Sequence, residues 1–229
     1  MDSIYETIKT PVMGHYDLIV AGGGIGGICA AISAKRNGVE RVLILEKSVL
    51  FGGLATIGLI SWYEPICDGH GRKLMYGMAD ELMQLAIRYG SDTLPEEWRG
   101  NPDAAKTNKR FSTHFSHSMF SLALDKLVKD HGIDILFDTC AVKPVMEKNK
   151  CIGIIVENKT GRSAYMAKVV IDATGDADIL ARAGVPCVNG KNYLSYIAFE
   201  ADTDTVKKAA ESEDMLKLRK WLTVGSDLW

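Results

Sequence analysis

Three glycines near the amino terminus have the spacing of a phosphate-binding turn. Gly22, Gly24 and Gly27 fit the pattern G-x-G-x-x-G and follow the apolar run Tyr16 to Ala21, which has the length of a strand. The first glycine of such a loop allows a sharp turn, the second lets the backbone approach a pyrophosphate, and the third lets the next helix pack on the strand. The spacing therefore predicts an anion site built from backbone atoms.

The residues after this loop predict a helix whose first turn faces the anion. The chain is expected to be helical from Ile25 to about Asn37 and to end on Gly38, which is a typical helix C-terminal cap. Ile25 and Gly26 stand at the start of this helix, where free N–H groups and the positive end of the helix dipole favour negative charge. Both residues are therefore candidate ligand contacts.

A second strand, expected over 41–45, ends at the acidic residue Glu46. Glu46 lies roughly twenty residues past the last glycine, where a carboxylate can accept hydrogen bonds from ribose hydroxyls and disfavours a 2′-phosphate. Lys47 follows it and is a further candidate contact. These residues leave open which dinucleotide binds, because Glu46 would serve the ribose of NAD equally well.

The composition is that of an ordinary globular protein. The 229 residues are 47% hydrophobic and 24% charged, enough for one sizeable core or one core and a smaller module. The formal charge of −2 and the absence of a dense basic run predict no nucleic-acid partner and no attraction to anionic lipid. Five scattered cysteines without a C-x-x-C pair suit the reducing cytoplasm. The uncharged run 18–34 is explained as strand and buried helix, so we expect neither a signal peptide nor membrane insertion.

The rest of the chain predicts an α/β fold with a parallel sheet. We expect a tail over 1–14, a nucleotide-binding domain over 15–190 and the start of a second domain over 191–229. Within the nucleotide-binding domain, the pattern predicts a helix over 73–89, an inserted loop over 91–110, a helix capped by Ser116 or Ser118 that ends near 131, and a strand over 133–137.

Three β-prone runs, 141–145, 151–157 and 164–173, predict an antiparallel meander. The last run is expected to re-enter the parallel sheet and to present the turn Thr174-Gly175-Asp176 at its carboxyl edge, where such sheets bind ligands. Beyond Pro186 we expect a strand of another layer over 193–200 and an amphipathic helical region over 205–222.

Four motifs together resemble a known family. They are GGGIGG with Glu46, GGLATIG at 52–58, CAVKPV at 140–145 and IDATGDAD at 171–178. The chain resembles the amino-terminal part of an FAD-dependent oxidoreductase of the glutathione-reductase-like superfamily, and more narrowly the branch shared with fumarate reductase and succinate dehydrogenase flavoproteins. The resemblance covers about Tyr16 to Val188. It implies a Rossmann-like FAD/NAD(P)-binding domain followed by a substrate domain.

The resemblance also implies FAD contacts. Besides the first glycine loop at the pyrophosphate and Glu46 at the adenosine ribose, it assigns Gly52, Gly53, Ala55 and Thr56 to the pyrophosphate and flavin edge, the Val142 backbone to the adenine, and Thr174, Gly175 and Asp176 to the turn beside the adenosine half. Two simpler interpretations remain open. Gly52 and Gly53 could form an ordinary hairpin turn, and Asp176 or Asp178 could cap a helix over 179–183.

The implied activity is transfer of hydride or electrons between FAD and an unidentified small molecule. His70, Arg72, His114 and His117 are available for proton transfer or carboxylate binding, but an isolated histidine in a polar loop is usually solvated, so we assign no catalytic residue. No histidine beside Gly52 offers a covalent flavin link, which predicts dissociable FAD.

Relatives in this superfamily run well past 229 residues, and the segment that returns to cover the flavin is not recognisable here. We therefore expect a truncated chain, or one whose active site is completed by a partner chain or another copy. An NAD-binding enzyme on the same fold and a non-catalytic nucleotide-binding module remain alternatives.

Overall fold

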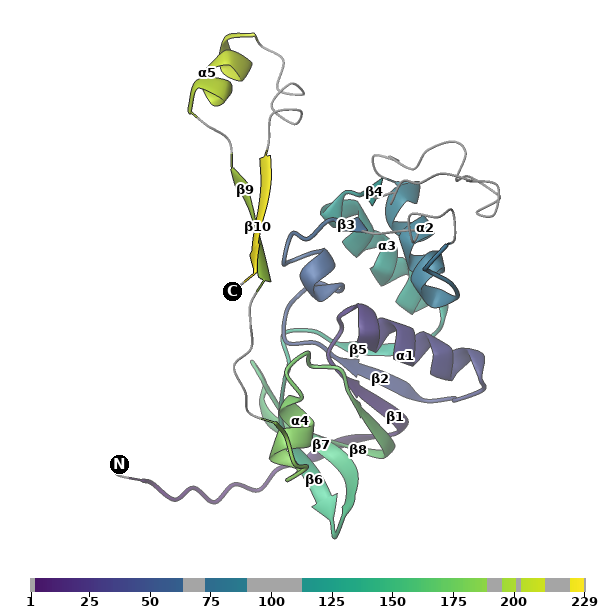
Figure 1. Ribbon diagram of the computed structural model, residues 1–229. Helices are drawn as coiled ribbons and strands as arrows, with labels where there is room; N and C mark the ends of the chain where they lie inside the picture. The colour runs from purple at the N-terminus through teal and green to yellow at the C-terminus, as the bar shows by residue number, and fades with distance from the viewer. Residues whose placement is uncertain are drawn as a thin grey trace. The chain divides into compact units, whose positions relative to one another are not determined.

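A six-stranded sheet organises the first of two units into which the chain divides, Met1–Pro186 and Cys187–Trp229. The computed structural model describes residues 3–63, 73–89, 113–188, 195–200, 203–212 and 223–228. The predicted inserted loop, 91–110, lies outside these residues. Figure 1 shows the sheet with helices α1, α2 and α3 stacked on one side of it.

The strand order of this sheet is β5-β2-β1-β8-β7-β6. Neighbouring strands run parallel from β5 to β8, and β8, β7 and β6 form the predicted antiparallel meander. The strands are β1 Val12–Ala21, β2 Val42–Leu45, β5 Asp134–Leu136, β6 Cys140–Glu147, β7 Lys150–Asn158 and β8 Gly161–Asp172. The long strand β8 pairs with both β1 and β7, so the predicted return to the parallel sheet is confirmed.

The first strand is longer than predicted. β1 begins at Val12, within the expected tail, because this segment pairs with β8: the Ala164 N–H donates to the Pro11 carbonyl over 2.8 Å. The sequence gives little sign of this extension, since Val12 and Met13 are exposed.

One face of the sheet is covered by α1 Ile25–Arg36, α2 Met78–Arg88 and α3 His117–Asp130. The predicted start of α2 at Lys73 is wrong, because Gly77 adopts a φ of +60° that interrupts the helical path. The Oγ of Ser116 accepts a hydrogen bond from the Met119 N–H over 3.4 Å, which confirms Ser116 as the cap of α3. The fully buried residues of this face include Val20, Ile28, Ile32, Leu82, Phe120 and Leu124.

The other face is covered by the meander and by α4 Asp178–Arg182. Ile19 and Leu43 of the parallel strands pack there with Ile154 of β7 and Ile179 of α4, and all four are buried. The parallel strands are therefore buried on both faces, as their nearly continuous apolar sequences predict.

Three short elements follow β2 in the first unit: the 3-10 helix η1 Gly53–Ala55 and the antiparallel strands β3 Trp62–Tyr63 and β4 Thr113–His114. In the second unit, β9 Ser195–Glu200 is the strand predicted there and pairs with β10 Thr223–Leu228, which was not predicted. Helix α5, Thr203–Glu211, covers the first part of the predicted helical region, and 213–222 lie outside the described residues.

Within the part of the chain that the structure describes, no helix is both long enough and apolar enough to cross a membrane.

Candidate cofactor site

Two glycines of the first loop are required by the fold itself. Gly22 has a φ of +108°, and its N–H donates to the Leu45 carbonyl over 2.7 Å. A Cβ on Gly22 would lie 2.3 Å from the Ala173 carbonyl oxygen, and one on Gly27 would lie 1.9 Å from the Gly22 carbonyl oxygen. The first glycine thus makes the turn at the end of β1 and the third lets α1 pack on it, which are the roles that the spacing predicts.

The fold does not require a glycine at the middle position of the loop. Gly24 has φ −69° and ψ 177°, which any residue adopts, and a Cβ on it would meet no described atom within 4 Å. Gly26 is likewise open and exposed. The loop therefore has open space above Gly24, at the position where the pattern brings a pyrophosphate against the backbone.

The amino terminus of α1 faces this space without a cap. Gly24 is its N-cap residue, no side chain of the described residues caps it, and its first turn carries no acidic residue. The first N–H groups of α1, beginning with those of Ile25 and Gly26, and the positive end of its dipole are thus left for an anion.

Glu46 is buried beside this loop, with 8% of its surface exposed. Its Oε2 accepts from the Gly23 N–H over 2.7 Å, and its Oε1 accepts from the Ser48 N–H over 2.7 Å. The carboxylate therefore links the loop to the end of β2, and each oxygen retains a lone pair for a ribose hydroxyl. The ribose role stays a prediction. Lys47, next to it, is exposed.

The second glycine pair lies against the first loop. The Gly52 N–H donates to the Gly23 carbonyl over 2.9 Å, and a Cβ on Gly53 would lie 3.5 Å from the Gly24 Cα. Gly52 and Gly53 have φ values of +104° and +55° and open η1, so the alternative of an ordinary hairpin turn is wrong. The two glycine loops form one surface around Gly24.

The buried side chain of Thr56 holds this second loop together. It is 2% exposed, and its Oγ1 donates to the Phe51 carbonyl over 2.5 Å. Its side chain is therefore part of the loop's own structure. Ala55 is half-buried and packs on the core.

The turn after β8 is held by an aspartate that sequence reasoning missed. The Asp172 Oδ1 accepts from the N–H and Oγ1 of Thr174, and its Oδ2 accepts from the N–H groups of Ile179 and Leu180. Burial raises the pKa of Asp172, but the hydrogen bonds from Leu180, Thr174 and Ile179 outweigh it and hold that pKa below its usual range.

Asp172 thus takes the capping role that the sequence had left open for Asp176 or Asp178. The N-cap residue of α4 is Ala177, no side-chain cap comes from it, and Asp176 is exposed. Gly175 is exposed with a φ of +91°. An aspartate two residues before a threonine at a strand end is typical of an Asx turn, and this signal could have pointed to Asp172.

Val142 occupies a β-bulge. Ala141 pairs with Val156 and Lys143 with Ile155, so Val142 is the extra residue of β6. The bulge removes the Val142 backbone from the ladder. An adenine could use that backbone, as the resemblance implies, and this role stays a prediction.

A comparison with known protein families decides between the dinucleotides that the loop left open. The model of the family described as FAD dependent oxidoreductase matches residues 17–213, which is most of the chain. The chain belongs to this family. FAD is the cofactor that this family implies, and the open space at Gly24, the uncapped start of α1 and the bulge at Val142 fit it.

Several known proteins are similar to this chain. Digeranylgeranylglycerophospholipid reductase of Sulfolobus acidocaldarius is 25% identical over 166 residues, which is 70% of this chain and 34% of that protein. A geranylgeranyl bacteriochlorophyll reductase-like structure from Thermoplasma acidophilum gives a TM-score of 0.53 at 23% identity, over 75% of this chain and 42% of that one. L-proline dehydrogenase from P. horikoshii also gives 0.53, at 16% identity, over 84% and 62% of the two chains. These structures show the fold. The chain spans about a third of the Sulfolobus relative.

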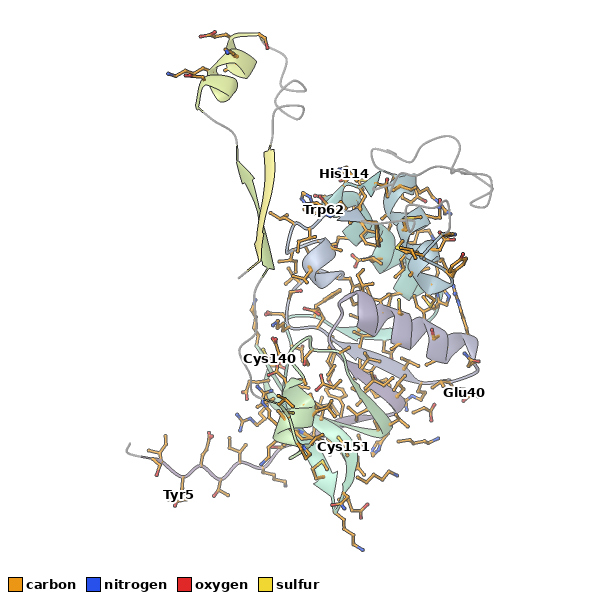
Figure 2. The ribbon with its side chains drawn as sticks, in the orientation of Figure 1. Tyr5, Glu40, Trp62, His114, Cys140 and Cys151 are labelled. Atoms are coloured by element: carbon orange, nitrogen blue, oxygen red, sulfur yellow. The ribbon has the colours of Figure 1, made fainter. Side chains whose placement is uncertain are left out.

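Only some of the candidate proton-transfer residues of this family member lie within the described residues. His114 is exposed on β4, and Figure 2 shows it beside Trp62 of β3, with ring centroids 6.1 Å apart at 62°. His117 is the exposed first residue of α3, and His70 and Arg72 lie outside the described residues. Burial, with a contribution from Cys29, raises the pKa of Tyr63 to about 12, so this phenol stays protonated at neutral pH.

The described cysteines offer no redox pair. Cys29, Cys140 and Cys151 form no disulfide with one another. Cys140 pairs with Glu157 and Cys151 with Met146, at opposite ends of the β6–β7 hairpin, and Figure 2 shows them well apart. Among the described residues, no three histidine, cysteine or acidic side chains could hold a metal ion together.

Proposed function

We propose that this protein is an FAD-dependent oxidoreductase that transfers hydride or electrons between dissociable FAD and a small-molecule substrate. The observation that carries the proposal is the open backbone at Gly24, below an uncapped helix start and beside the buried carboxylate of Glu46. Membership of the FAD dependent oxidoreductase family supports it.

The residues of this chain bind and orient the cofactor. The first N–H groups of α1 donate to the pyrophosphate, and Gly24 and Gly53 let it approach the backbone. Glu46 accepts from the ribose, the backbone of Val142 contacts the adenine, and Thr174 and Gly175 border the adenosine half. The remaining assigned contacts come from Gly22, Ile25, Gly26, Gly27, Lys47, Gly52, Ala55, Thr56 and Asp176. The flavin supplies the redox chemistry, and the protein supplies orientation and electrostatics.

Two classes of substrate are candidates. The motifs favour the fumarate reductase and succinate dehydrogenase branch, whereas the Sulfolobus relative is named as a reductase of a digeranylgeranyl lipid. The cysteine pattern favours a reducing, cytoplasmic location. Completion of the active site by a second copy or a partner chain is part of the proposal.

Release of the bound chromophore tests the proposal. The purified protein is denatured by heat, and the absorption and fluorescence of the supernatant are recorded. About one flavin per chain supports FAD, and bleaching of the bound flavin by dithionite with recovery in air shows that it is redox-active. A colourless chain that takes up no added FAD contradicts the proposal. A chain that binds FAD but is reduced by no substrate in any assembly supports the non-catalytic module instead.

A further inference from the structure

We propose that Asp172 is a positioning residue that fixes the turn 173–177 against the phosphate loop, so that the loop is already shaped for the cofactor before FAD arrives. This inference rests on the proposed function, because the loop is the assigned pyrophosphate site. Neither the glycine spacing nor the motif resemblance assigned a role to Asp172.

Four hydrogen bonds converge on the Asp172 carboxylate. Its Oδ1 lies 3.1 Å from the Thr174 N and 2.7 Å from the Thr174 Oγ1. Its Oδ2 lies 2.9 Å from both the Ile179 N and the Leu180 N. One side chain therefore joins the first residues of the turn to the first turn of α4.

Helix α4 depends on this carboxylate for its start. It has five residues, and its N-cap residue, Ala177, has a φ of +57° and no capping side chain. The Thr174 Oγ1 accepts from the Asp178 N–H over 3.0 Å while it donates to Asp172. Without the carboxylate, the donors at Ile179 and Leu180 lose the acceptor that the structure gives them.

The turn touches the phosphate loop directly. The Ala173 N–H donates to the Ala21 carbonyl over 2.8 Å, immediately before the loop. A Cβ on Gly22 would lie 2.3 Å from the Ala173 carbonyl oxygen, and one on Gly27 would lie 3.3 Å from the Ala173 Cβ. Because Ala173 fills the space beside both glycines, a shift of the turn changes the packing of the loop.

Two substitutions at Asp172 should weaken FAD binding to different extents. Asn retains one accepting oxygen, so Asp172→Asn keeps one pair of these hydrogen bonds, whereas Asp172→Ala keeps none. We expect FAD affinity to fall about tenfold in Asp172→Asn and about a hundredfold in Asp172→Ala, measured by quenching of flavin fluorescence. In the FAD-free chain, amide exchange should accelerate at Thr174, Ile179 and Leu180, and also at Gly22, whose N–H bonds to the Leu45 carbonyl.

Two control variants separate positioning from charge and from stability. Asp178→Asn removes the same charge nearby, where the side chain bonds to Arg182 at 3.3 Å, and should leave FAD affinity within about twofold. Ile179→Val removes a methyl group from the buried face of α4 and is expected to lower stability without weakening FAD binding.

The inference is overturned if Gly22 exchanges at the wild-type rate in both Asp172 variants, or if Asp172→Asn weakens FAD no more than Ile179→Val does. A wild-type chain that binds no FAD contradicts the proposed function, and exchange at Gly22 still decides whether Asp172 positions the loop.

Discussion

Alanine at two glycines of the same loop should separate folding from cofactor binding. At Gly27 the added Cβ would lie 1.9 Å from the Gly22 carbonyl oxygen and 3.1 Å from its carbonyl carbon, and both are backbone atoms that cannot rotate away. At Gly24 the Cβ would meet no described atom within 4 Å. The substitution is the same, and only its surroundings differ.

The expected magnitudes follow from these distances. Overpacking of a tight site costs about 1–3 kcal/mol, and the gain in helix propensity from Gly to Ala offsets at most about 1 kcal/mol, so Gly27→Ala should lower the free energy of unfolding. Because Gly24 has φ −69° and ψ 177°, alanine fits its backbone without strain. Gly24 is also the N-cap residue of α1, where glycine is preferred to alanine, so this cost and the reduced entropy of the unfolded chain should offset each other and leave the free energy of unfolding of Gly24→Ala within about 1 kcal/mol of wild type.

For FAD binding, we expect Gly24→Ala to act directly on the cofactor site rather than through folding. In Gly24→Ala the methyl group enters the space assigned to the pyrophosphate, and we expect FAD to bind at least about tenfold more weakly to a fully folded chain. Urea unfolding followed by circular dichroism gives the stability of the FAD-free proteins, and quenching of flavin fluorescence gives the affinity. If Gly24→Ala binds FAD as tightly as wild type, the pyrophosphate does not lie over Gly24 and the assignment of the site is wrong.

Three further substitutions address neighbouring parts of the site. Glu46→Gln places an NH₂ group against the N–H of Gly23 or Ser48, so we expect the free energy of urea unfolding to fall by about 1–3 kcal/mol and FAD to bind more weakly. Wild-type stability in this variant would show that Glu46 does not hold the loop. Thr56→Val removes the hydroxyl that donates to the Phe51 carbonyl and should cost about 1–3 kcal/mol in thermal unfolding of the FAD-free chain, whereas an unchanged melting temperature would exclude this role. Because the pKa of Asp172 is lowered in the folded chain, its carboxylate stabilises the fold above the unfolded pKa of about 3.9, and this stabilisation is lost as the pH falls through the folded pKa. The difference in the free energy of unfolding between wild type and Asp172→Asn should therefore be constant above about pH 5 and shrink below about pH 4. A difference that is unchanged down to about pH 2 would contradict the lowered pKa.

The sequence predicted the elements whose signals are local. The span of α1, the cap at Ser116 and the apolar parallel strands each depend on residues close to one another in the chain. The start of α2 was predicted too early because Leu74 continues the helical spacing, and only the φ of Gly77 shows that the helix begins after it. Spacing alone does not report a backbone dihedral.

The site residues whose roles the sequence missed, or predicted only in part, depend on contacts between segments that are distant in the chain. The capping role of Asp172 requires the chain to turn back so that Ile179 and Leu180 meet its Oδ2. The bulge at Val142 is defined by the register of β6 against β7, which the meander pattern does not specify. Glu46 was identified for a ribose, yet its bonds to Gly23 and Ser48 belong to the folded chain and could not be read from the motif.

The phosphate loop is therefore supported from three sides by segments that carry predicted FAD contacts of their own. Glu46 bonds to the Gly23 N–H, Gly52 donates to the Gly23 carbonyl, and Ala173 packs against Gly22. A substitution in any of these segments can weaken FAD binding by displacing the loop, without removing a direct contact. Loss of affinity alone does not identify a ligand residue in this site. Gly24 is the position where the distinction is clearest, because its Cβ direction meets no described protein atom, so a loss of FAD affinity at unchanged stability there points to the cofactor itself.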